Sequence, residues 1–178
     1  MRISTRIHIP EINLWLPGHS LLMNFSIFLH VQLSTLPATA IDEAGVPRTI
    51  SPNATMFHSA AGLGNVQHGI VAGTGIAPVD IENYVLAAKV LNGVGAGQLQ
   101  YSAQSFQAPA RLDNSTQWAL TRSFTNNSGS AIIIQELGLL SSAGLAPPFF
   151  LLFREVIEPI PILNGATRTF SIVFTLSA

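Results

Sequence analysis

Residues 2–9 alternate strictly between two kinds of side chain, as a β-strand with one buried face does. The face predicted to be buried consists of Ile3, Thr5, Ile7 and Ile9. Pro10 and then Pro17-Gly18 follow, and both favour turns over regular structure. We therefore divide the chain into an N-terminal strand, or arm, with its linker over residues 1–18, and one β-sandwich domain over residues 19–178.

The next apolar segment, residues 21–33, is predicted to be a long strand buried on both faces. One apolar row of this strand would consist of Phe25, Ile27, Leu29 and Val31. A secretion signal is the alternative. The charge-bearing stretch ahead of the uncharged run 12–41 is unusually long for a signal, and Pro17, Gly18, Asn24 and His30 interrupt that run. The same interruptions argue against a membrane-spanning helix.

Beyond residue 34 the sequence indicates short strands separated by turns. Residues 34–64 are rich in Pro, Ala, Thr and Gly and predict loops with one or two short strands. A strand is predicted over residues 67–71, a helical turn begins at Asp80, and alternation returns over residues 98–108. Glycine clusters between these segments are typical of β-turns and lie at residues 73–75 and 93–97.

The last third of the chain has the clearest pattern. A hairpin is predicted from strands at residues 117–125 and 131–140, with its turn at residues 126–129. Two further strands are predicted at residues 149–156 and 167–176. Pro159 and Pro161 allow only irregular or edge pairing. About eight strands and little helix predict an all-β fold, a two-sheet antiparallel sandwich of jelly-roll type with an extended N-terminal strand.

Ionic side chains are scarce. Charged residues make up 10% of the chain, whereas an ordinary soluble domain has about 25%, and the mean hydropathy is +0.41. A free monomer of this composition would expose larger apolar patches than soluble monomers normally tolerate. We therefore expect further copies of the chain to cover much of its surface.

Charge pattern and cysteine content restrict the chemistry further. The net charge is -1, and Lys89 is the single lysine beside seven scattered arginines, so no basic stripe is available to bind phosphates. We expect no nucleic-acid partner. Without cysteine the chain has no disulfide, thiolate metal site or cysteine nucleophile, but this does not fix its compartment.

Five segments between residues 67 and 178 are distinctive: Gly69 to Gly75, Tyr84 to Gly93, Ile134 to Leu139, Leu151 to Val156, and the closing strand that follows Asn164-Gly165. Together these segments resemble virion structural proteins of tailed phages. The resemblance implies a jelly-roll-like subunit of a virion or virus-like filament, such as a head-decoration, tail or fibre protein. The arm lies outside the resemblance, so its role has to be argued from the residues.

No clear catalytic or metal-binding pattern is present. The histidines lack the short spacings of metal ligands and lie at His8, His19, His30, His58 and His68. No serine lies in a Gly-x-Ser-x-Gly motif, and the close acidic pairs are Asp42-Glu43 and Asp80 with Glu82. A glycosidase pair could still come from distant strands, but solvated loop acids fit better. We predict no catalytic residue, cofactor or metal.

Two features of the sequence could involve sugars, namely glycosylation sequons and aromatic side chains. Asn-x-Ser/Thr sequons begin at Asn24, Asn53, Asn114 and Asn126. Asn24 falls in the predicted buried strand, whereas the other three are candidate glycosylation sites, with ordinary turn asparagines as the alternative. Four dispersed aromatic residues either stack on a sugar or, as is more common, anchor the core and interfaces. They are Trp15, Tyr84, Tyr101 and Trp118.

These patterns lead to a hypothesis of assembly. The arm of one subunit adds to a sheet edge of its neighbour, with a donor strand formed by Ile3, Thr5, Ile7 and Ile9. The alternative is that the arm folds back as the first strand of its own sandwich. We expect a non-enzymatic subunit of an extracellular particle that binds copies of itself, with other virion proteins or glycans as further partners and no membrane. The alternative function is a carbohydrate-binding jelly-roll module.

Overall fold

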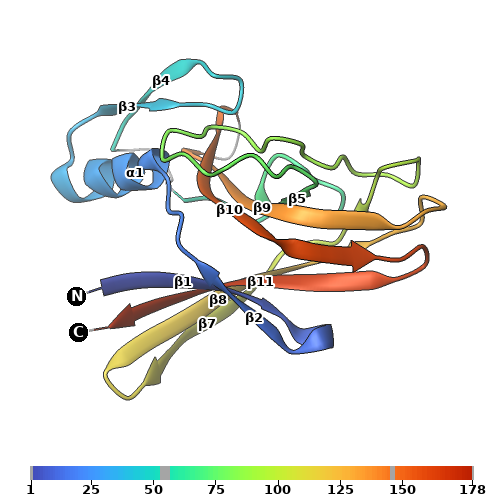
Figure 1. Ribbon diagram of the computed structural model, residues 1–178. Coiled ribbons are helices and arrows are strands. Elements are labelled where there is room, and N and C mark those ends of the chain that lie inside the picture. The colour runs from blue at the N-terminus through green and yellow to red at the C-terminus, as the bar shows by residue number, and fades with distance from the viewer. Residues whose placement is uncertain (1, 53–56, 145–146, 178) are drawn as a thin grey trace.

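The computed structural model of the chain describes residues 2–52, 57–144 and 147–177, most of which lie in antiparallel strands. In chain order the elements are β1 (Arg2–Ile9), η1 (Pro10–Ile12), β2 (Leu14–Gly18), α1 (Met23–Ser34), β3 (Ala38–Ile41), β4 (Pro47–Ile50), β5 (Gly69–Gly73), β6 (Gln100–Tyr101), β7 (Ser105–Leu112), β8 (Ser115–Thr125), β9 (Ile132–Ser142), β10 (Phe149–Ile162) and β11 (Thr167–Ser177). The start of β1 lies beside the end of β11, so the two ends of the chain are close together (Figure 1).

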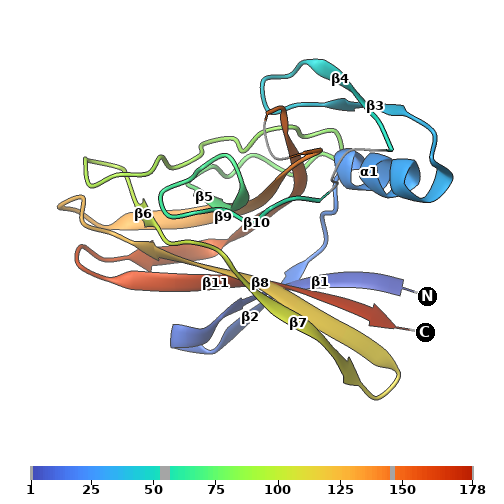
Figure 2. The same cartoon turned by 180° about the vertical axis from the view of Figure 1, so that it is seen from behind.

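Two sheets face each other (Figures 1 and 2). The long sheet has the strand order β2-β1-β11-β8-β6, and β7 also pairs with β8. The short sheet has the order β10-β9-β5, and β3 pairs with β4 in a separate hairpin. The all-β, two-sheet antiparallel sandwich that the sequence predicts is therefore confirmed, whereas jelly-roll connectivity stays a prediction.

Strand β10 takes part in two apolar cores. Its residues Leu151 and Phe153 belong to the main core between the sheets. Its alternate residues belong to a smaller core under α1, which consists of Phe28, Val31, Ala40, Ile50, Phe150 and Leu152. Successive side chains of a strand point to opposite faces, so one strand joins both cores. The helix therefore covers the outer face of the short sheet.

The N-terminal strand folds back into its own molecule. Strand β1 pairs with β11, with Ile7 opposite Ile172, and with β2, with Thr5 opposite Gly18. Thr5, Ile7 and Ile9 are buried and Ile3 is partly buried, so the predicted face is the correct one. The edge of β11 gains these hydrogen bonds without the entropic cost of recruiting a second molecule. The structure therefore has the folded-back arrangement and not the donated arm, and residues 2–18 are part of the long sheet.

The strand predicted over residues 21–33 is wrong, because Met23–Ser34 form helix α1. The buried residues Asn24, Phe28 and Val31 recur at helical spacing, so the presumed apolar row of alternate residues does not share one face. The side chain of Asn24 donates to the Ile41 carbonyl at 2.8 Å and accepts from the Ile41 N–H at 3.2 Å. A uniformly apolar run is compatible with either element, and tertiary packing decided between them.

The hairpin predicted over residues 117–140 is also wrong. Strand β8 pairs with β11 in the long sheet, whereas β9 pairs with β10 and β5 in the short sheet. The chain crosses between the sheets at Asn126, which is 0% exposed and donates its amide to the Ile162 carbonyl at 2.7 Å. Strand β10 continues through Pro159 and Pro161 as the sheet edge, with an irregular register there, as the prolines predict.

We expect Ile7→Ala to lower the free energy of unfolding of the dilute monomer by about 2–4 kcal/mol, because the variant leaves a cavity at a fully buried position. Urea titration followed by circular dichroism measures the change. Ser4→Ala, on the other face of β1, is the control and should stay within about 0.5 kcal/mol of the wild type. Equal stability of the Ile7→Ala variant and the wild type would mean that β1 leaves its own sheet in solution.

Candidate functional site

A buried ion pair joins β9 to β10. Glu136 Oε2 and Arg154 Nη2 are 2.9 Å apart, and the two side chains are 0% and 2% exposed. Removing two charges from water costs several kcal/mol for each, unless further hydrogen bonds satisfy the remaining polar atoms. The sequence signal for this pair is an ionic residue within an apolar strand, Arg154 in β10, and it was not among the predicted site residues.

The connection between β5 and β6 supplies the missing hydrogen bonds. Glu136 accepts from the backbone N–H groups of Gly75, Ala87 and Ala88. Arg154 donates to the carbonyls of Ala77 and Pro78 and to the side chain of Asn83. A Cβ atom on Gly73 would lie 2.5 Å from Glu136 Oε1, so this glycine permits the close approach. The pair therefore holds a long irregular loop against the short sheet.

Arg122 of β8 holds the segment ahead of β5 in place by hydrogen bonds. Its guanidinium donates to five backbone carbonyls, those of Gly62, Asn65, His68, Ile70 and Ser102. Burial lowers the pKa of Arg122 to about 10, which leaves it charged at neutral pH. The guanidinium lies 4.9 Å from the ring centre of Tyr101. Both buried arginines thus donate to the protein's own acceptors and have structural roles.

The histidines are dispersed, with one exception. The rings of His58 and His68 lie 5.1 Å apart, and His68 Nε2 is 3.0 Å from Ser142 Oγ. Burial lowers the pKa of His68, and the proximity of His58 lowers it further. Among the residues that the structure describes, no three His, Cys, Asp or Glu side chains gather as a metal site requires.

The close acidic pairs stabilise loops. Asp42 is 4% exposed, pairs with Arg48 at 2.8 Å and accepts the N–H groups of Ala44 and Val46. Glu43 forms an ion pair with Lys89. Asp80 accepts the N–H of Glu82 at 2.8 Å within an exposed turn. The expectation of solvated loop acids is correct for Asp80 and Glu82 and wrong for Asp42, which is buried in an ion pair.

The candidate glycosylation sites have different environments. Asn114 is exposed in the turn between β7 and β8, so its glycosylation stays a prediction. The accessible position predicted for Asn126 is wrong, because the side chain is fully buried and hydrogen-bonded. Asn53 lies outside the described residues. Asn24 is buried, as predicted, although in a helix.

The four aromatic residues lie in separate environments. The ring of Trp15 stacks on His8 at 4.1 Å, with the guanidinium of Arg6 4.8 Å from its centre. Tyr101 is 1% exposed and donates to the Val90 carbonyl at 2.6 Å. Trp118 stacks on Phe174, and Tyr84 lies on the loop between β5 and β6. They do not form a common sugar-stacking platform.

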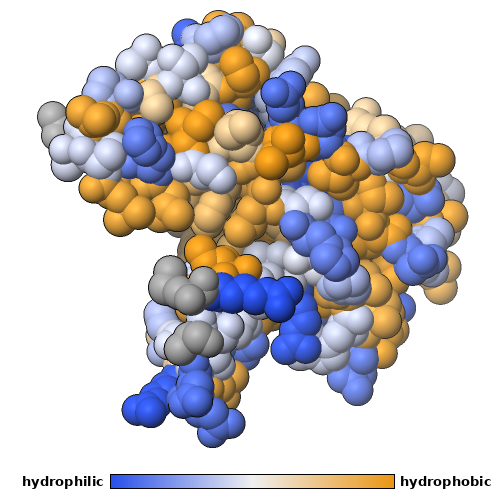
Figure 3. Space-filling model, turned by 60° about the vertical axis from the view of Figure 1, so that its left-hand side comes forward, coloured by the Kyte–Doolittle hydropathy of each residue, from blue (hydrophilic) through white to orange (hydrophobic). Residues whose placement is uncertain are grey.

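A cavity lined almost entirely by apolar side chains lies where the two layers separate. On one side a helical stripe of α1 consists of Phe25, Leu29 and Leu33. On the other side the inner face of the long sheet contributes Ile3, Phe106, Trp118, Phe174 and Leu176. We call this cavity, of about 520 Å³, the apolar groove. Figure 3 shows apolar side chains gathered beneath the upper layer, above the end of the long sheet.

The apolar groove is open because the long sheet extends beyond the short one (Figure 1). Phe106 is 54% exposed and Leu33 is 78% exposed, so its rim reaches solvent. The floor is formed by Leu120, Leu139 and Leu152, and Ser59 is the one polar residue among those lining it. No local sequence pattern predicts this site, because its residues come from segments that are far apart in the chain.

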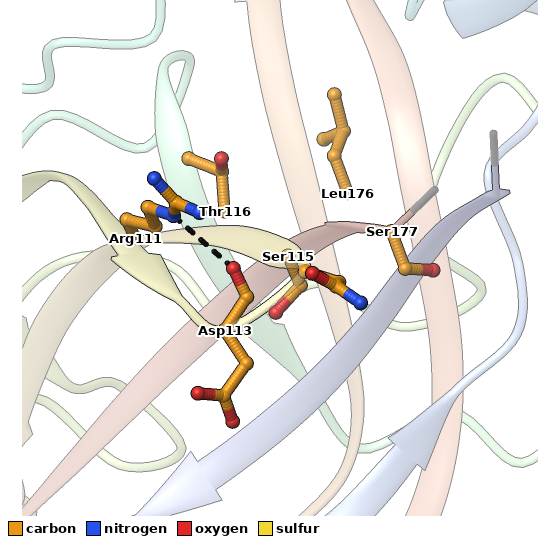
Figure 4. Close-up of a pocket in the computed structure, with 7 residues that line it drawn as sticks. Arg111, Asp113, Ser115, Thr116, Leu176 and Ser177 are labelled. Atoms are coloured by element: carbon orange, nitrogen blue, oxygen red, sulfur yellow. Dashed lines mark hydrogen bonds between the residues drawn. The ribbon is translucent and has the colours of Figure 1, made fainter.

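A shallower hollow adjoins the end of the long sheet. Its volume is about 590 Å³, and polar residues from the β7–β8 turn and the end of β11 line it (Figure 4). Arg111 Nε donates to the carbonyl of Asp113 at 3.2 Å, as the dashed line in Figure 4 marks. Asn114 also lines this hollow. The exposed sequon therefore lies at the same end of the long sheet as the apolar groove, because Leu176 lines both.

Comparison of the chain with protein-family models, with curated proteins and with solved structures gives no match. Within residues 2–52, 57–144 and 147–177, no helix has the length and apolar content needed to cross a bilayer.

We expect Glu136→Gln to lower the free energy of unfolding by about 3–5 kcal/mol, because it leaves Arg154 charged, buried and without its counter-ion. Urea titration measures the loss. Glu82→Gln, at an exposed position on the same loop, is the matched control and should change stability by less than about 0.5 kcal/mol. Similar midpoints for the two variants would contradict a role of the pair in holding the loop.

Acid should destabilise the protein through His68. The folded-state pKa of His68 lies below 6.5, so the unfolded chain takes up a proton first as the pH falls through that value. The contribution of His68 to stability is complete above pH 6.5 and is lost on acidification below it. Measured between pH 7 and 5, unfolding of His68→Gln should depend less on pH than that of the wild type. The exposed control His30→Gln should retain the wild-type slope.

Proposed function

We propose that the chain is a non-enzymatic structural subunit that assembles with copies of itself into an extracellular particle, such as a virion component or a virus-like filament. The observation that carries this proposal is the apolar groove. Apolar surface in contact with water costs about 25 cal/mol per Å², so covering the groove stabilises an assembly. A lining almost without polar groups suits another protein surface better than a polar ligand.

The distribution of charge supports self-association. Few residues are ionic, and four of those that the structure describes are buried, namely Asp42, Arg122, Glu136 and Arg154. The outer surface therefore carries even fewer charges than the composition suggests. A weakly charged surface resists association poorly, which favours contacts between copies.

The use of the buried polar residues supports a non-enzymatic role. A catalytic group has to be free to interact with a substrate, usually in a cleft. Arg122, Glu136 and Arg154 instead direct their polar atoms to the protein's own backbone and to each other. The carbohydrate-binding alternative is less favoured, because His8 and Arg6 contact the ring of Trp15 that a sugar would need.

We expect the purified chain to form species larger than a monomer as its concentration rises, in sedimentation velocity and negative-stain microscopy. Leu33→Gln places an amide on the groove stripe of α1, so it should raise the concentration needed for assembly by about tenfold, equivalent to about 1.4 kcal/mol. Leu63→Gln is the matched control, because Leu63 is 83% exposed and lies outside the groove lining. A wild-type chain that stays monomeric at high concentration would refute the proposal.

A further inference from the structure

Strand β7 is an edge of the long sheet. It pairs with β8 on one side and with no further strand on the other, within the residues that the structure describes. Every residue of β7 is exposed. Figures 1 and 2 show the hairpin of β7 and β8 projecting beyond the short sheet. Backbone N–H and C=O groups along such an edge are a template for another strand, so a strand is the occupant that fits this surface.

The other edges of the two main sheets are less suited to pairing. The loop that follows β5 covers its edge, since Val90 donates its N–H to the Ala72 carbonyl at 2.9 Å. Leu22 donates its N–H to β10 at 2.9 Å, and the far part of β10 contains prolines. Strands β2 and β6 are five and two residues long, and β2 contains Pro17. Short strands, covering segments and prolines all prevent edge-to-edge pairing, which leaves β7 as the available edge.

The two faces of β7 follow an order that is the same in either direction. Phe106 lies opposite Leu120 of β8, and Arg111 lies opposite Thr116. Leu120 and Thr116 share one face of β8, because an even number of positions separates them. Phe106 and Arg111 therefore also share a face, since the irregularity at Ala108-Pro109 adds one residue to β7. The opposite face carries Ser105, Gln107, Ala110 and Leu112. An edge with this symmetry about Ala108-Pro109 is complementary to itself.

We propose that β7 pairs antiparallel with β7 of a second copy of this chain, about a twofold axis at Ala108-Pro109, so that two long sheets join into one. Phe106 then lies opposite Arg111 of the second copy. Arg111 is the one ionic residue of β7, so it meets an aromatic ring and not its own copy. Pro109, which lacks an N–H, lies at the axis, where the register with β8 is already interrupted.

This inference rests on the proposed function and adds an interface to it. The contact is isologous, because the same surface serves on both copies, and it closes at two copies. Growth beyond a dimer needs a second contact, for which the apolar groove is available. Phe106 lies where the two surfaces meet, because it belongs to β7 and also lines the groove.

Cysteine variants test the register, because the chain has no cysteine of its own. Gln107→Cys and Ala110→Cys, mixed in equal amounts under mild oxidation, should form a disulfide-linked dimer on a denaturing gel. In the proposed register these residues face each other, with Cβ atoms about 4.5–5.5 Å apart. Either variant alone should cross-link at most about a tenth as much, because each residue lies about 10 Å along the strand from its own copy.

The matched control is the mixture of Ser105→Cys with Ala110→Cys. Both residues lie on the same face as Gln107, but Ser105 faces Leu112 of the second copy in the proposed register. The control pair is therefore about 7–8 Å apart, too far for a disulfide, and should also cross-link at most about a tenth as much.

Ala108→Asp tests the contact without cross-linking. The substitution places two like charges beside each other at the axis, so the dimer should dissociate at concentrations at least about tenfold higher than the wild-type dimer does, in sedimentation velocity. Leu63→Asp, at an exposed position outside β7, should associate as the wild type does. Ala108 is exposed, and unchanged circular dichroism verifies that both variants fold.

The outcomes separate this inference from the proposed function. If the wild type assembles but the mixture of Gln107→Cys and Ala110→Cys cross-links no more than its control, the inference is overturned while self-assembly remains. If the mixture cross-links in register but the wild type stops at dimers at high concentration, the inference holds and the larger particle is refuted. If the wild type is monomeric throughout and the mixture does not cross-link, both fail.

Discussion

The ion pair between Glu136 and Arg154 is the constraint on which the rest of the fold depends. Neither side chain has water to solvate it, so each needs a full set of protein partners. Those partners are backbone groups of the loop between β5 and β6, which has little regular structure of its own. A loop rich in glycine and alanine is thus held in one conformation by two side chains from the sheet beneath it.

A buried charged side chain also anchors loops to the long sheet. The two ends of the sandwich differ in how they are held. Arg122 binds five carbonyls of the connections around β5 and β6, which holds these segments over the main core. No such network supports the end where β1 and β11 terminate, within the residues that the structure describes. There the layers separate, and α1 and the long sheet face each other across the apolar groove.

Local patterns were sufficient for much of the architecture. The alternation over residues 2–9 and 167–176 identified β1 and β11 because a half-buried strand repeats every two residues. The alternation cannot distinguish a donated arm from a folded-back arm, because both arrangements bury the same face of β1. Pro159 marked an edge strand correctly, because proline lacks the N–H that an interior strand needs. The apolar groove was inaccessible, because Ile3, Phe25 and Trp118 meet only in three dimensions.

By itself, the sequence determined the all-β class, most strand positions and the low share of charged residues, 10% of the chain. These properties depend on composition or on neighbours within a few residues. Tertiary structure decided that residues 23–34 are helical, that the chain changes sheets at Asn126, and that Glu136 meets Arg154. The physical reason is that uniformly apolar runs and isolated polar residues have no preferred local conformation. They take the one in which distant segments bury their apolar atoms and satisfy their polar ones.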